Sequence, residues 1–302
     1  MARLANRITR RLGFGLVSRH DLDLLNTVRE SVLSTIPPRH RYSLPQRRLG
    51  HAGFALDDAA PLALLDSLRA AGFQELFAAL RGNPEINTGF LGRNYASAGL
   101  IHNGFYPTPD AELYAAMIRL HRPDRIIEIG SGYSTVIART TIDSLGLDCR
   151  IHSWDPRPRR DIGHYAHQMR YEPVESGSLT PAEFTDRTLL FIDSSHACRS
   201  GGDLPFLYCQ LLPALTRPVL IHVHDVFTPW DYPDDYLERF YTEQYLLQAW
   251  LAHSPELEVV FATHHMARQY PERMQAAFGK QVGVEPLFCG ASFWVRKGPA
   301  PR

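Results

Sequence analysis

The chain has no excess of charge of either sign. Its 302 residues carry 32 Lys and Arg against 32 Asp and Glu, so the formal net charge is zero. A strongly basic balance is the usual electrostatic footprint of nucleic-acid binding, so the neutral balance predicts no nucleic-acid partner. No apolar run approaches the roughly 18 residues that cross a bilayer, so we expect no transmembrane segment.

Cysteine is also scarce. The four cysteines, Cys149, Cys198, Cys209 and Cys289, are scattered and form no CxxC pair. This usage is typical of reduced thiols, and it predicts a cytoplasmic protein rather than a small disulfide-bonded one. There is also no internal repeat. A chain of this length therefore holds one large domain with an appendage, or two small domains.

The first 100 residues have a different pattern from the rest. We expect residues 1–100 to form a helical N-terminal region, because apolar stripes such as the one at 73–80 repeat at helical spacing. Residues 1–17 place arginines around an apolar face, which predicts a solvated amphipathic helix docked on the main domain. Peripheral membrane contact or a transit peptide stays open as an alternative. Residues 101–302 form the second predicted domain.

Predicted strands and predicted helices alternate from residue 108 onward. Thr108 and Pro109 form a good N-cap and first-turn pair for a helix that ends at His121. Strands are expected at 125–130, 149–155, 188–193 and 218–225, with helices between them at 134–145, 161–168 and 202–213. This alternation predicts an α/β fold, a doubly wound, Rossmann-like parallel sheet covered on both faces. Two further strands, at 256–263 and 290–297, flank a helical segment at 271–278 and predict a closing hairpin.

The segment Arg125–Thr135, RIIEIGSGYST, is the most informative one in the chain. A short buried strand containing Glu128 runs into a glycine-bracketed turn at 130–132, and a helix starts at Tyr133. Glycines let the backbone bend sharply and approach a ligand, and the helix N-terminus adds free N–H donors. This arrangement is typical of the nucleotide-binding half of a doubly wound domain, but the turn alone leaves the ligand open.

Four motifs, in order and with compatible spacing, carry a resemblance to a known family. They are IEIGSGYST at 127–135, FIDSSH at 191–196, HVHDVF at 222–227 and EQYLLQA at 243–249. From about Phe105 to Lys297 the chain resembles the class I S-adenosylmethionine (SAM)-dependent methyltransferases, in a bacterial branch similar to metal-dependent O-methyltransferases. The resemblance implies SAM as the cofactor. It also implies that the last strand inserts antiparallel into the sheet.

The same resemblance implies a set of cofactor-binding residues. Gly130, Ser131 and Gly132 would line the methionine and ribose parts of SAM, and Glu128 would help to position the ammonium group. Asp155, at the end of the second strand, would bind the ribose hydroxyls, as carboxylates do in dinucleotide sites. The alternative for Asp155 is a helix-capping aspartate, since a proline follows it.

Acidic and histidine side chains follow two neighbouring predicted strands. Asp193 and His196 come after one strand, and His224 and Asp225 end the next. Because parallel strands end at the same edge of a sheet, we expect these side chains in one crevice. The resemblance implies Asp193 as a metal ligand and His196 as the general base, and His224 departs from the family's oxygen ligands. Magnesium prefers oxygen, so a site of Asp193, His224 and Asp225 favours manganese or another transition ion.

Two alternatives stay open at these strand ends. His222 lies two residues before His224 on the same strand face and could join a metal site. Both histidines could instead be hydrogen-bonded supports of the sheet end. Without a metal, His196 could still act as the base, with Asp193 as its orienting partner.

We expect a SAM-dependent methyltransferase that methylates a hydroxyl group of a small molecule or saccharide. A non-catalytic binding protein that keeps the fold stays open, and so does an NAD-linked oxidoreductase. The NAD hypothesis is disfavoured because Thr135 stands where a GxGxxG motif needs its third glycine. The aromatic stretch 228–241 is expected to be a substrate lid, with ordinary packing or an oligomer contact as alternatives.

Overall fold

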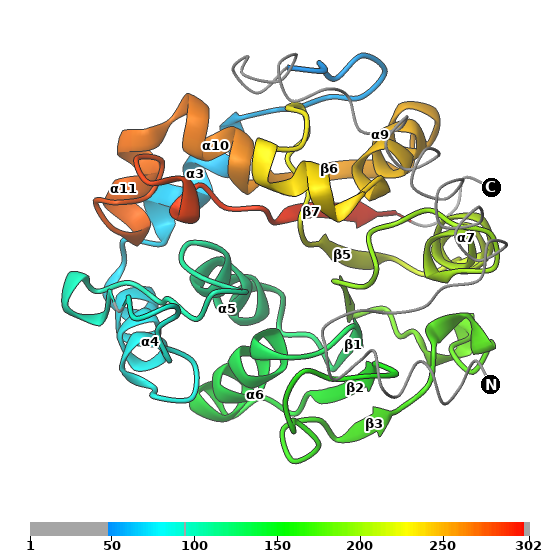
Figure 1. The fold of residues 1–302 in the computed structure, drawn as a ribbon, viewed down its shortest axis with the longest axis horizontal. Helices are drawn as coiled ribbons and strands as arrows, with labels where there is room; N and C mark the ends of the chain where they lie inside the picture. The colour runs from blue at the N-terminus through cyan, green and yellow to red at the C-terminus, as the bar shows by residue number, and fades with distance from the viewer. Residues whose placement is uncertain (1–47, 94, 299–302) are drawn as a thin grey trace, which may run out of the picture. The chain divides into compact units, whose positions relative to one another are not determined.

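The computed structural model describes residues 48–93 and 95–298, so the predicted helix at 1–17 lies outside the described residues. The chain divides into two compact units. The larger unit, Arg47–Tyr232 and Tyr241–Arg302, contains one sheet of seven strands in the order β3-β2-β1-β4-β5-β7-β6 (Figure 1). Of the other unit, only Pro233–Phe240 is described, with the short helix η6 (Asp234–Arg239).

The strands of the sheet are β1 (Arg125–Ile129), β2 (Arg150–Trp154), β3 (Gln168–Arg170), β4 (Thr188–Ile192), β5 (Val219–Val223), β6 (Leu257–Ala262) and β7 (Phe293–Lys297). The α-helices are α3 (Ala59–Ser67), α4 (Ala71–Gly82), α5 (Asp110–His121), α6 (Tyr133–Leu145), α7 (Asp203–Phe206), α8 (Leu212–Ala214), α9 (Glu243–His253), α10 (Thr263–Gln269) and α11 (Pro271–Phe278). A π-helical segment, η5 (Leu207–Leu211), joins α7 to α8. Among the described residues, no helix has the length and apolar character needed to cross a bilayer.

The apolar strands are covered on both faces, as their near-continuous hydrophobic sequences predict. Along β4, Leu189 and Phe191 belong to one core cluster, and Leu190 and Ile192 belong to the other. Figure 1 shows α5 and α6 on one side of the strands and α7 on the opposite side. The fold is therefore a doubly wound α/β sheet, as predicted.

The closing hairpin is also confirmed. β7 runs antiparallel to both of its neighbours, β5 and β6, while β1 to β5 pair in parallel. The antiparallel last strand expected from the resemblance is therefore present, inserted between β5 and β6.

The helix predicted at 161–168 is wrong. The carboxylate of Asp161 accepts the N–H of Gly163 at 3.1 Å and bends the chain into turns. His167 then donates its N–H to the carbonyl of Ile151 at 2.9 Å, which leads the backbone into the edge strand β3. Local side-chain bonding of an aspartate and the freedom of a glycine override the helical pattern here.

The start of α5 also differs in detail from the prediction. Pro109, rather than Thr108, occupies the N-cap position. The hydroxyl of Thr108 instead donates to Glu112 at 2.8 Å and accepts the N–H of Ile101 at 2.8 Å. Thr108 therefore fixes the segment before α5 against the first turn of that helix.

Helices α3 and α4, from the region expected to be a separate helical part, belong to the same compact unit as the sheet. The side chain of Arg81 in α4 pairs with the buried Glu112 of α5 at 2.8 Å and donates to the carbonyl of Phe278 at 2.7 Å. Gln74 donates to the carbonyl of Ala277 at 3.2 Å. These bonds join α4 to the helices α5 and α11.

Candidate active site at the switch point of the sheet

The strand order reverses between β1 and β4, and the ends of these two strands meet. The N–H of Asp193 donates to the carbonyl of Ile129 at 2.8 Å. Gly130 has a φ of 88°, and a Cβ on it would lie 2.8 Å from the carbonyl carbon of Asp193. Only glycine fits so close to this backbone. Open α/β sheets bind ligands at such switch points, so the glycine turn and Asp193 share the expected location of a site.

Asp155 ties the glycine turn to the end of β2. Its Oδ2 accepts hydrogen bonds from the N–H of Ser131 at 3.1 Å and from the hydroxyl of Ser131 at 2.7 Å. Its Oδ1 accepts the N–H of Arg157 at 2.8 Å, which closes a local turn after β2. The next element after β2 is the strand β3, so Asp155 does not cap a helix. It holds the glycine turn, where the resemblance places the ribose of a cofactor.

Glu128, in the strand β1, supports the glycine turn at 130–132 through hydrogen bonds. Its side chain is fully buried, and its Oε2 accepts the hydroxyls of Thr135 at 2.8 Å and Ser153 at 2.7 Å. Thr135 in turn accepts the N–H of Gly132 at 3.2 Å. Burial raises the pKa of Glu128 to about 7, although these hydrogen bonds act in the opposite direction. Its Oε1 makes no hydrogen bond with a described residue. Glu128 therefore changes its charge near neutral pH.

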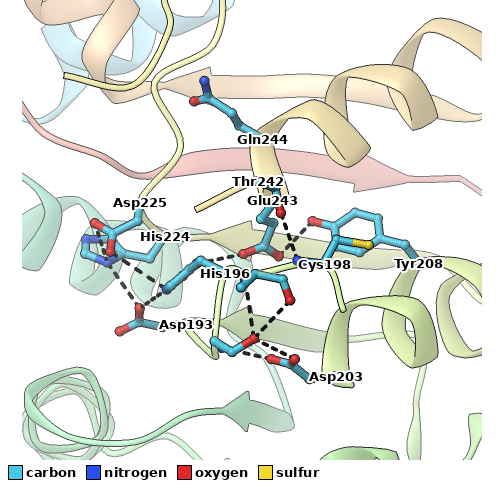
Figure 2. Close-up of polar contacts among 12 residues, drawn as sticks. Asp193, His196, Cys198, Asp203, Tyr208, His224, Asp225, Thr242, Glu243 and Gln244 are labelled. Atoms are coloured by element: carbon cyan, nitrogen blue, oxygen red, sulfur yellow. Dashed lines mark hydrogen bonds and ion pairs between the residues drawn. The ribbon is translucent and has the colours of Figure 1, made fainter. Parts of the chain in front are cut away.

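Asp193, His196, His224 and Asp225 converge where β4 and β5 end (Figure 2). His196 Nε2 lies 3.0 Å from Asp193 Oδ1 and 3.8 Å from Asp225 Oδ2. His224 Nδ1 lies 3.5 Å from Asp193 Oδ1 and 3.7 Å from Asp225 Oδ1. The side chain of Asp193 is 35% exposed, while those of the other three are less than 10% exposed. Asp193 is therefore the solvent-facing member of this cluster of four.

Two bends in the chain bring these side chains together. His196 and Asp225 both have a φ of 55°, in the left-handed region that residues other than glycine rarely adopt. The segment before His196 is held by Ser195, whose N–H and hydroxyl donate to the carboxylate of Asp203 at 2.8 and 2.6 Å. The carbonyl of His196 accepts the N–H of Glu243 at 3.1 Å at the start of α9. Such uncommon backbone conformations cluster at functional sites.

A buried carboxylate holds the second ring nitrogen of His196. Nδ1 lies 2.7 Å from Glu243 Oε2, and the hydroxyl of Tyr208 donates to Glu243 Oε1 at 2.9 Å (Figure 2). Burial alone would lower the pKa of His196, but its hydrogen bonds with Asp193 and Glu243 raise that pKa well above the ordinary value. Both ring nitrogens are engaged with carboxylates. In this arrangement His196 keeps a proton, so the role of general base requires that Nε2 first leave Asp193.

His224 also has a carboxylate on the far side of its ring. Its Nε2 lies 3.6 Å from Asp110 Oδ2, and Asp110 is fixed by the N–H groups of Ala291 and Ser292 at 2.8 and 3.1 Å. Burial acts to lower the pKa of His224, but the charges of Asp225 and Asp193 raise it well above its usual range. Neither ring nitrogen of His224 makes a hydrogen bond with a described residue. His224 is thus held by ion pairs with three carboxylates at 3.5 to 3.7 Å.

His222 lies outside this cluster. Its ring stacks on Trp294 with 4.0 Å between the ring centroids, and it packs against Phe191 and Tyr114 in the core. Burial holds the pKa of His222 well below its ordinary value, so this imidazole is neutral. His222 therefore belongs to the aromatic core beneath the site.

Two residues of the site were not predicted. Glu243 was part of a recognised motif, but it lies 47 positions after His196, and nothing in the motif shows which side chain it meets. Asp110 directly follows Pro109 at the start of a helix, where an acidic residue is ordinarily interpreted as a favourable first-turn charge. An acidic residue in the first turn of each of two helices was the available signal, and the sequence does not show that both are buried.

Comparisons with solved structures find several similar chains. One is the methyltransferase PaMTH1 of Podospora anserina, bound to S-adenosylhomocysteine (SAH). The two chains share 16% sequence identity with a TM-score of 0.39, and the match covers 80% of this chain and 97% of that chain. Another is an O-methyltransferase of Bacillus cereus in complex with SAH, with 13% identity and a TM-score of 0.37, covering 78% of this chain and 89% of that one. No family model matches the sequence, and no curated protein matches it. The function proposed below therefore rests on the site itself.

Proposed function

We propose that the protein is a SAM-dependent methyltransferase that methylates a hydroxyl oxygen of a small molecule or saccharide. The observation that carries this proposal is the close contact between the glycine turn and the cluster of four acidic and histidine side chains at the switch point. The backbone of Gly130, in the turn that suits a nucleoside cofactor, packs directly against Asp193, in the cluster that suits proton removal. A methyl donor and a hydroxyl acceptor could thus be held side by side.

The cofactor side of the proposal rests on the turn and its supports. Asp155 places its carboxylate at the end of β2 and accepts two hydrogen bonds from Ser131, so it lies beside the glycine turn. A Cβ added to Gly132 would meet no described atom within 4 Å, so this backbone can accept a ligand at close range. The N-terminus of α6 begins at the next residue and adds N–H donors for the carboxylate of a methionine group.

The chemical side rests on the cluster of four. The acceptor hydroxyl must lose its proton as its oxygen attacks the methyl carbon, while the bond from that carbon to the sulfonium breaks and S-adenosylhomocysteine leaves. Asp193 is the member that solvent and an acceptor can reach. His196 is our candidate for removing that proton, in agreement with the role that the resemblance implies, and Asp193 is the side chain that would orient it.

An NAD-linked oxidoreductase is less compatible with the same residues. The side chain of Thr135 occupies the position of the third glycine and links Gly132 to Glu128 by two hydrogen bonds. A third glycine there would serve close helix–strand packing in a dinucleotide site. Thr135 instead works as part of the turn's support, so a dinucleotide fits less well than SAM.

The test is methyl transfer from labelled SAM. The full chain is incubated with labelled SAM and a panel of polyols, phenols and saccharides, with and without a chelator. We expect label in at least one hydroxyl acceptor, and we expect the Gly132→Leu variant to transfer less label than the native chain at the same SAM concentration. Tight SAM binding without transfer to any acceptor would favour the non-catalytic binding protein instead.

A further inference from the structure

We propose that a surface patch beside the glycine turn binds the phosphate group of a soluble phosphate ester, such as a sugar phosphate or a nucleotide-linked saccharide. The patch combines a run of arginines after β2 with two aromatic rings. The residues of this arginine patch are Arg157, Arg159, Arg160, Phe105 and Tyr133. That the ester is the methyl acceptor rests on the proposed function, whereas binding of the ester can be measured without SAM.

The arginine patch lies beside both halves of the candidate active site. Tyr133 directly follows Gly132 of the glycine turn and begins α6. Phe105 directly precedes Tyr106, whose buried ring lies 4.7 Å from the ring of His224 in the cluster of four, measured between centroids. The rings of Phe105 and Tyr133 are stacked, with 6.1 Å between their centroids. A ligand on the arginine patch is therefore one residue along the chain from the glycine turn, and one residue from a ring that packs on the cluster of four.

The three arginines form no ion pair with a carboxylate of the described residues. Arg157 and Arg159 are exposed, and their side chains make no hydrogen bond or ion pair with a described residue. The side chain of Arg160 donates one N–H to a backbone carbonyl at 3.1 Å. The two acids that flank this run, Asp155 and Asp161, accept backbone N–H groups instead. The guanidinium groups therefore keep most of their N–H donors for a ligand.

Aromatic rings hold two of these guanidinium groups in place. Arg159 lies over Phe105 at 5.2 Å from the ring centroid, and Arg160 lies over Tyr133 at 4.8 Å. A guanidinium stacked on a ring keeps the N–H donors at its own edge free, and it loses side-chain freedom before a ligand arrives. The hydroxyl of Tyr133 also lies 2.9 Å from that of Thr88, which fixes this ring. Binding an anion here therefore costs less conformational entropy than binding it to unsupported arginines.

The aromatic surface next to these arginines suits the rest of the ester. Phe90 and Phe105 are 39% and 48% exposed, and their rings meet edge to face with 5.6 Å between centroids. A Cβ on Gly104 would clash with the ring of Phe90, so this packing requires the glycine. Sugar rings and nucleobases stack on exposed aromatic rings. A phosphate on the guanidinium groups thus places the remainder of its ester beside a stacking surface.

The charge of the arginine patch selects a phosphate ester among anions. A phosphate monoester carries about 1.5 to 2 negative charges near neutral pH and has three acceptor oxygens, so more than one guanidinium can share it. A carboxylate pairs with one guanidinium through its two oxygens, and three arginines within four residues exceed that need. Binding to an anionic membrane surface ordinarily takes a cluster of roughly four to eight basic residues. We therefore assign a soluble ester to this patch.

The test titrates the full chain by calorimetry in a chloride buffer without phosphate. The probes are glucose 1-phosphate, UDP-glucose, glucose, and vesicles of equal parts phosphatidylglycerol and phosphatidylcholine. We expect at least one of the two esters to bind at least about 10-fold more tightly than glucose, because only the esters make charge-assisted hydrogen bonds with the arginines. The tighter of the two esters shows whether a sugar phosphate or a nucleotide-linked saccharide fits better. Equal affinity for glucose and both esters would overturn the proposal, and so would binding to the vesicles alone.

Variants locate the binding at the arginine patch. Arg159→Gln and Arg160→Gln should each weaken ester binding by about 10-fold and leave SAM affinity unchanged. Arg159→Lys, which keeps the charge but loses the planar fork, should weaken it less than Arg159→Gln does. The matched control is Arg217→Gln, at a half-exposed arginine that pairs with Asp186 at the amino ends of the strands, and it should bind as the native chain does. Thermal unfolding checks that each variant is folded. Native ester affinity in both folded Gln variants of the patch would refute the proposal, as would a loss of SAM affinity alone, which would assign the patch to the cofactor.

The outcomes also separate this inference from the proposed function. A chain that binds an ester through these arginines but never binds SAM would keep the arginine patch and refute the methyltransferase proposal. A chain that methylates an unphosphorylated acceptor with the same KM as its phosphate ester would keep the proposed function and overturn this inference.

Discussion

Replacing Gly130 by alanine should destabilise the protein, because this glycine joins the glycine turn at 130–132 to the end of β4. Its φ of 88° lies in the left-handed region, which costs another L-residue about 1–2 kcal/mol. The new Cβ would lie 2.8 Å from the carbonyl carbon of Asp193 and closer still to its oxygen. The backbone must then shift, at a cost of about 1–3 kcal/mol. We expect Gly130→Ala to lower the free energy of unfolding by about 2–5 kcal/mol.

Gly132, two residues later, offers a matched control. A Cβ there would meet no described atom within 4 Å, so Gly132→Ala should change the free energy of unfolding by less than about 1 kcal/mol. Gly132→Leu should keep the fold but weaken SAM binding by about 1–3 kcal/mol, or roughly 5- to 150-fold, because its side chain would occupy the space proposed for the cofactor.

Urea unfolding at a constant m-value measures the first effect, and calorimetric titration with SAM measures the second. A Gly130→Ala protein as stable as the native one would refute the close approach of the turn to β4. A Gly132→Leu protein with native SAM affinity would refute the placement of the cofactor at this turn.

Three further predictions follow from the site. Asp155→Ala should weaken SAM binding by about 1–3 kcal/mol, since it removes both a proposed ribose partner and the acceptor for the Ser131 bonds; equal affinity by calorimetry would exclude that role. The folded-state pKa of Glu128, about 7, lies above its usual 4.5, so its ionisation destabilises the fold as pH rises through that range. Between pH 4.5 and 8, the free energy of unfolding of the native protein should fall by about 3 kcal/mol more than that of the Glu128→Gln variant. If the two free energies of unfolding change in parallel with pH, the pKa of Glu128 is not raised. His224→Asp should move metal preference toward magnesium by restoring an oxygen ligand, and an unchanged order of metal affinities in titrations would place His224 outside the ion's ligands.

The sheet was predictable because its strands are short, apolar and buried on both faces. β1, β4 and β5 fall within the predicted segments, since runs such as TLLFI leave no polar face for solvent. β3 was not predicted, because it has three residues, all partly exposed, and QMR shows neither alternation nor an apolar run. The sequence before β3 follows a helical pattern, and only the pairing with β2 selects the strand.

The strand-end residues of the site were predictable, but their partners were not. Asp193, His196, His224 and Asp225 could be placed together because parallel strands end at one edge. Glu243 reaches His196 from the first turn of α9, and Asp110 reaches His224 from the start of α5, so both contacts depend on how helices dock on the sheet. The protonation of His196 depends on those same contacts. The sequence alone therefore suggested a base where the structure has an imidazole between two carboxylates.

Calorimetric titration of the full chain with SAM, and separately with NAD, tests the central claim most directly. The proposed function predicts one equivalent of SAM bound per chain, no heat with NAD, and weakened SAM binding by the folded Gly132→Leu variant. Binding of NAD in place of SAM, or no binding of SAM by the native chain, would contradict it.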